Sequence, residues 1–113
     1  MIHEYRDFYA IQNMMPGAAH PLRVGGVVVF RTSGYTCRLE RYEGNPGINP
    51  FILNLTLAIE GPDAGQQVLD VLTPCELEEY RIEQPSLEYT HVTFHVDRPD
   101  VEPPPSIPVE RPV

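Results

Sequence analysis

Lysine and tryptophan are both missing from this 113-residue chain, and cysteine occurs only twice. A chain without lysine cannot form a lysine Schiff base and lacks the phosphate-binding lysine of a P-loop. A chain without tryptophan lacks the Cys…Trp…Cys signature of antibody-type domains. No secretory signal pattern precedes Cys37 and Cys75, so we expect both to be reduced thiols in a cytoplasmic protein.

Long apolar runs and an excess of positive charge are missing as well. The longest aliphatic or aromatic run, residues 27–30, is far shorter than the roughly 20 residues of a membrane helix. The formal net charge is -8, which would repel the phosphates of nucleic acids and of anionic lipids. These features predict no nucleic-acid partner and no membrane partner.

What the chain does contain is a series of segments in which apolar and polar residues alternate, as in a β-strand with one buried face. Five such segments are separated by turns rich in Gly, Pro and Asn, and they cover residues 22–31, 35–43, 51–60, 75–83 and 87–97. A weaker segment, residues 67–73, is either a short strand or a crossing piece. The segment 51–60 alternates most regularly, so we expect it to be a central strand.

These segments predict an all-β fold, a small antiparallel β-sandwich of about six to seven strands with immunoglobulin- or fibronectin-like connectivity. The two sheets are expected to meet over four apolar side chains, Val28, Leu39, Leu55 and Phe94. Thr32-Ser33-Gly34 predicts a hairpin turn with Gly34 at positive φ.

The sandwich domain is expected to span residues 22–97. Residues 1–21 predict an irregular N-terminal arm, with a further strand as the alternative. Residues 98–113 hold six of the thirteen prolines and predict a Pro-rich extended tail, lying free or as a strap along the surface.

His91 and His95 share one face of the last segment and are the first candidates for a metal site. The remaining ligands would have to come from neighbouring segments, where Glu40, Glu78 and His20 are available. The spacing specifies none of them. We favour an exposed polar strand face as the explanation of the two histidines over a metal site.

The acidic segment 76–83 is the second candidate, because paired carboxylates act as general acid and base when burial separates their pKa values. Glu76 and Glu78 share one face and Glu79 lies on the other. We expect these groups to face solvent, where they would prevent edge-to-edge strand pairing. A calcium site is conceivable for three acidic residues whose spacing misses the known loop signature, Glu60, Asp63 and Asp70.

Cys37, Cys75 and Ser33 are the nucleophile candidates. Ser33 lacks the flanking glycines of a nucleophile elbow, and Cys37 is explained by a small core side chain. We therefore assign no catalytic, cofactor-binding or metal-binding residue and expect no cofactor.

The loop 44–50 is the most plausible binding feature, because its two prolines would present Asn45, Ile48 and Asn49 rigidly. The alternative is that Ile48 caps the core and the loop only connects two strands. In the tail, Pro105-Ser106-Ile107-Pro108 fits the loose PxxP pattern of groove-binding peptides.

Two hypotheses of function follow. The first is a non-enzymatic protein-binding or assembly module, with a protein partner of unknown identity and a homodimer as one form of assembly. The second is a small metal-binding protein or metal-dependent enzyme that uses His91 and His95.

Overall fold

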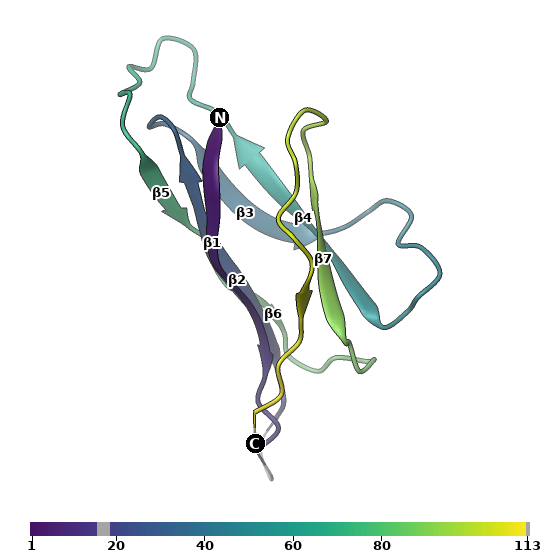
Figure 1. Ribbon diagram of the computed structural model, residues 1–113. Coiled ribbons are helices and arrows are strands. Elements are labelled where there is room, and N and C mark those ends of the chain that lie inside the picture. The colour runs from purple at the N-terminus through teal and green to yellow at the C-terminus, as the bar shows by residue number, and fades with distance from the viewer. Residues whose placement is uncertain (16–18, 113) are drawn as a thin grey trace.

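The computed structural model describes residues 1–15 and 19–112, which form eight strands and no helix. In chain order the strands are β1 (Ile2–Gln12), β2 (Leu22–Phe30), β3 (Thr36–Arg41), β4 (Ile52–Glu60), β5 (Thr73–Glu76), β6 (Tyr80–Ile82), β7 (His91–Val96) and β8 (Ile107–Pro108). They build two sheets that pack on one another (Figure 1). The predicted small β-sandwich is confirmed. In the described residues no helix is long and apolar enough to cross a membrane.

The two sheets have different pairing patterns. In sheet A, β2 is flanked by β1 on one side and by β5 and β6 on the other, all antiparallel. In sheet B the order is β3-β4-β7-β8, so β4 is central, as predicted. However, β4 and β7 run parallel. Immunoglobulin-like sandwiches consist of antiparallel sheets, so that finer connectivity is not confirmed.

The inward side chains of both sheets form one hydrophobic core. The four predicted core residues all belong to it: Val28 and Leu55 are fully buried, and Phe94 and Leu39 retain 2% and 9% exposure. Phe94 from sheet B packs edge-on against Phe8 from sheet A, with ring centroids 5.2 Å apart. Each large apolar side chain buried in this way contributes roughly 1.5–3 kcal/mol.

For residues 2–12 the prediction of an irregular N-terminal arm is wrong and the alternative, a further strand, is confirmed, because these residues form β1. Asp7 has a φ of 58°, and the pairing with β2 shifts register between Arg6 and Tyr9. Arg6 and Asp7 are consecutive exposed residues. A β-bulge of this kind breaks the period of two, which is why alternation alone did not show the strand.

The turn at residues 32–34 does not close a hairpin. Gly34 has the predicted positive φ, 94°, but β2 and β3 belong to different sheets, so the turn carries the chain from sheet A to sheet B. The Ser33 N–H donates to the Leu69 carbonyl (3.0 Å), and the Leu69 N–H donates to Ser33 Oγ (2.8 Å). These bonds to the loop 61–72 replace the ladder of a hairpin.

The weaker segment and the acidic segment fold differently from the expected strands. Residues 67–72 are exposed loop, and Thr73 begins β5. The acidic segment is divided into β5 and β6, with Leu77 buried between them and its N–H bonded to the Gly26 carbonyl at 2.9 Å. Pro74 lies inside β5, where it is tolerated because β5 is an edge strand.

The proline-rich end lies along the sandwich as a strap, the yellow segment of Figure 1. After β8 has paired with β7, the Glu110 N–H donates to the Ala10 carbonyl, and the Gln12 N–H donates to the Glu110 carbonyl, both at 2.9 Å. Val109, between β8 and this bridge, is buried in the core. The strap therefore joins the β7–β8 edge of sheet B to β1 of sheet A and closes that side of the sandwich.

Gly26 is expected to be essential for packing, because a Cβ there would lie 2.5 Å from the ring of Phe8. Phe8 also contacts Phe94, so Gly26→Ala should destabilise the fold by roughly 1–3 kcal/mol in denaturant unfolding. Gly61→Ala is the matched control, because a Cβ there would come no closer than 3.5 Å to the ring of Tyr35, an ordinary van der Waals contact. Equal losses in the two variants would contradict this account.

Tyr5 is expected to make the fold sensitive to alkali. Its hydroxyl donates to the Glu102 carbonyl at 2.6 Å, and burial, assisted by the Glu102 charge, raises the pKa of Tyr5 from 10.0 to about 12. The resulting stabilisation is complete below pH 10.0 and is lost as the pH rises toward 12, since only the unfolded chain ionises in that interval. In this window the free energy of unfolding of the wild type should fall more steeply than that of Tyr5→Phe. Parallel curves would refute the assignment.

Candidate functional site

An open cleft of about 750 Å³ lies between sheet B and the β6 end of sheet A. One wall consists of the end of β3, the loop 43–50 and the start of β4, and the other of β6 and residues 86–89. Figure 1 shows the β3–β4 loop projecting away from the body of the sandwich. The cleft has the size of a small-ligand pocket and thus accommodates one or two large side chains.

The loop 43–50 is built by its own asparagines. Asn45 Oδ1 accepts from the Gly47 N–H, and Asn49 Oδ1 accepts from the Phe51 N–H, both at 2.9 Å. Such side-chain turns fix the backbone locally. We expected Asn45 and Asn49 to face a partner. The side-chain oxygen of each instead accepts a hydrogen bond from the loop backbone.

Ile48 is left fully exposed, at 103% of its reference surface. The alternative in which Ile48 caps the core is therefore wrong. Ile48 shares the cleft with other aliphatic and aromatic side chains, which are Tyr42, Ile52, Leu53, Tyr80, Ile82, Leu87 and Tyr89. Their ionisable neighbours in the lining, apart from tyrosines, are Arg41 and Glu43. The loop was predicted from sequence, whereas the opposite wall was not. The signal available for that wall was an apolar or aromatic residue at positions 80, 82, 87 and 89.

Both walls carry a strand edge. In the described part of the chain β3 pairs with β4 alone, and β6 pairs with β2 alone. The outward N–H and C=O groups of an edge strand are a template for another extended chain. The cleft thus offers apolar side chains and backbone hydrogen-bonding groups side by side.

The structure does not bring His91 and His95 to one point. They lie four residues apart on β7, a separation of about 13 Å along a strand. The His95 ring stacks on Tyr42, with centroids 3.7 Å apart, and its Nε2 lies 3.0 Å from Asn54 Oδ1. His91 Nδ1 lies 3.1 Å from Thr90 Oγ1.

The residues considered as further metal ligands have other contacts. Glu40 bonds Arg38 Nε at 2.6 Å, and His20 Nδ1 lies 2.8 Å from the Asn13 carbonyl. Glu78 is exposed in the link between β5 and β6. Throughout residues 1–15 and 19–112, no three His, Cys, Asp or Glu side chains form a group that could hold a metal ion, and this covers the proposed calcium ligands at 60, 63 and 70.

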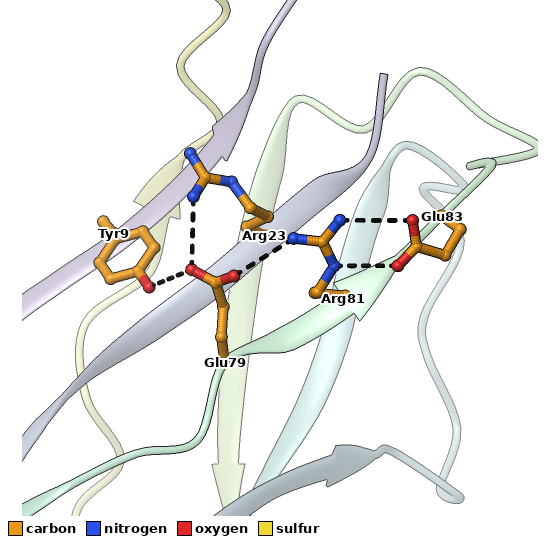
Figure 2. Close-up of polar contacts among 5 residues, drawn as sticks. All are labelled: Tyr9, Arg23, Glu79, Arg81 and Glu83. Carbon is orange, nitrogen blue, oxygen red and sulfur yellow. Dashed lines mark hydrogen bonds and ion pairs between the residues drawn. The ribbon is translucent and has the colours of Figure 1, made fainter. Parts of the chain in front are cut away.

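Glu79 is the acidic residue with the most contacts on sheet A. Its carboxylate accepts the Tyr9 hydroxyl at 2.6 Å and lies 3.6 Å from both Arg23 and Arg81, as Figure 2 shows. Arg81 in turn pairs with Glu83 at 2.9 Å. Burial, followed by the hydrogen bond to Glu79, raises the pKa of Tyr9. The cluster ties β1, β2 and β6 together, while Glu76 and Glu78 remain exposed as expected.

The remaining candidates are also committed to the fold. Ser33 Oγ accepts the Leu69 N–H at 2.8 Å, so this hydroxyl serves the sheet-to-sheet turn. In the PxxP motif, Ile107 pairs with Val92 and the Ser106 hydroxyl lies 2.7 Å from that of Thr93. The motif belongs to the strap and is not a free tail.

Comparison of the chain with known protein families, with curated proteins and with solved structures finds no match. The class that the fold and the site define is a small β-sandwich with an open cleft between its two sheets, lined by apolar, aromatic and polar side chains.

The Tyr9–Glu79 contact is expected to contribute about 1 kcal/mol to stability. A double-mutant cycle with Tyr9→Phe and Glu79→Ala measures this coupling, because the cycle cancels the effects of each variant on Arg23 and Arg81. Tyr9→Phe combined with Glu83→Ala is the control, since Glu83 contacts Arg81 and not Tyr9. A coupling no larger than that of the control would contradict the assignment.

Proposed function

We propose that this protein is a non-enzymatic binding module that takes an extended, largely apolar segment of a partner protein into its cleft. The observation that carries the proposal is the cleft itself, where aliphatic and aromatic side chains lie next to residues of two edge strands, Arg41 at the end of β3 and Tyr80 and Ile82 of β6.

Strand addition is the binding mode that these features favour. In this mode backbone hydrogen bonds to an edge strand supply affinity, and alternate side chains of the added segment enter pockets that supply specificity. Ile48 from the β3–β4 loop and Leu87 from the segment 86–89 both line the cleft and offer apolar contacts to such a segment. The loop is fixed by its asparagine turns, so it loses little entropy on binding.

The charge of the lining limits the kind of partner. Arg41 and Glu43 carry opposite charges, so the cleft itself has no strong field despite the net charge of -8. A segment of low net charge fits this lining better than a strongly basic or acidic one. A second copy of the chain is one such partner and would give a homodimer.

We place the module in the cytoplasm, which is supported by two cysteines in the thiol form.

The cleft proposal is tested by selecting peptides from a displayed random library on the wild type. Ile48→Asp should weaken binding of the selected peptides at least tenfold, because it puts a charge into an apolar contact. Since Ile48 is fully exposed, the free energy of unfolding should change by less than about 0.5 kcal/mol. Val71→Asp is the matched control, an exposed apolar residue in the loop 61–72.

Three outcomes are informative. Selective loss in Ile48→Asp supports the cleft. Failure to enrich any peptide, or equal loss in both variants, overturns it. Light scattering identifies a second copy as the occupant if the wild type is a dimer that Ile48→Asp, but not Val71→Asp, converts to a monomer.

A further inference from the structure

The two long sides of the sandwich are closed in different ways. On the β1 side, backbone hydrogen bonds of the strap connect the sheets, through Ala10, Gln12 and Glu110. On the opposite side, the edge strands β3 and β5 face each other without a shared ladder in the described residues. What connects them there is a pair of cysteines, Cys37 on β3 and Cys75 on β5.

The two sulfur atoms are already in contact. Cys37 Sγ lies 2.8 Å from Cys75 Sγ, closer than two unbonded sulfur atoms normally approach, and 3.8 Å from the Cys75 carbonyl oxygen. Each cysteine is fixed by its own ladder, since Cys37 pairs with Ile59 and Cys75 with Val28. Both cysteines are half-buried against the core, so the pair lies at the edge of the core and not in its centre.

We propose that Cys37 and Cys75 form a reversible disulfide that bridges β3 and β5 and so links the two sheets. The bridge depends on cysteine placement alone and is independent of the proposed cleft function. It would add a covalent closure where β3 and β5 share no ladder in the described residues. Both thiols are reduced in the structure, so the bridge is a second state of the same protein.

The oxidant that the proposal requires is a low-molecular-weight disulfide such as glutathione disulfide. The thiolate of one cysteine attacks a sulfur of this reagent, and a mixed disulfide forms as one small thiol leaves. The second cysteine, as its thiolate, then attacks the protein sulfur of the mixed disulfide and releases the second small thiol. The protein loses two protons and two electrons, and the reagent takes them up to become two thiols.

Bridge formation is expected to be slow at neutral pH. Burial, followed by the hydrogen bond to Cys75, raises the pKa of Cys37 well above its usual range. Only the thiolate reacts, so the rate of oxidation should increase as the pH rises from 7 toward 9. A pair of exposed, ordinary thiols would react faster at neutral pH and would gain less from the same increase.

The test incubates the full chain with glutathione disulfide and follows the thiols and the melting temperature. Intact mass should fall by two hydrogens, and peptide mapping should join Cys37 to Cys75 within one chain. The bridge connects residues 38 positions apart, so the Tm should rise by roughly 10 °C or more and return when dithiothreitol is added.

Cys75→Ala and Cys37→Ala are the matched controls, and in both the Tm should not respond to the oxidant. Mass and mapping on the wild type need no variant, so the test remains decisive if either variant fails to fold. Two free thiols after prolonged incubation at pH 9 would overturn the proposal. It would also be overturned by a product containing only mixed disulfides, or only bridges between chains.

Discussion

The inward faces of the two sheets meet over Phe30, Phe94 and the aliphatic side chains around them, and the other features of the molecule take their positions from that contact. Phe30 is fully buried and Phe94 retains 2% exposure. A chain of this length buries only part of its apolar surface on folding, so its stability is sensitive to each core residue. Recruiting Ala10 and Val109 from the two ends of the chain enlarges the core beyond residues 22–97.

The two long sides of the sandwich are closed differently, and both the cysteine pair and the cleft lie on the side without the strap. The strap seals the β1–β8 side with backbone hydrogen bonds. The other side has edge strands on both sheets, so it carries the cysteine pair where β3 approaches β5. Toward β6 the cleft replaces that contact. The interruption at Leu77 separates the two regions, because it divides the edge strand into β5 and β6.

Local periodicity was sufficient for the fold class and for the facing of the regular strands. Val28, Leu39, Leu55 and Phe94 were assigned to the core from alternation alone, and all four belong to it. The bulge at Asp7 hid β1, because one extra residue shifts the polar–apolar pattern. The parallel pairing of β4 and β7 and the role of Gly34 in changing sheets depend on contacts distant in sequence, which no local pattern encodes.

One wall of the cleft was predictable from sequence and the other was not, because contacts between segments distant in sequence leave no local pattern. The prolines and asparagines of the loop 44–50 marked an ordered loop, but its facing wall lies more than thirty residues further along the chain. Likewise, Cys37 and Cys75 gave no sign in sequence that their sulfur atoms would meet. Both pairings arise only when the two sheets pack.

The polar side chains that could take part in chemistry make hydrogen bonds or packing contacts within the fold, whereas several apolar side chains at the cleft remain exposed. His95 is engaged by Tyr42 and Asn54, and Glu79 by Tyr9. A single exposed isoleucine would need no explanation, because isolated apolar residues are common on protein surfaces. Ile48 and Leu87, however, are both exposed and both line one cleft, where apolar surface is in contact with water. Filling that space with an apolar side chain removes both surfaces from water at once, which is the physical reason to favour binding at this position.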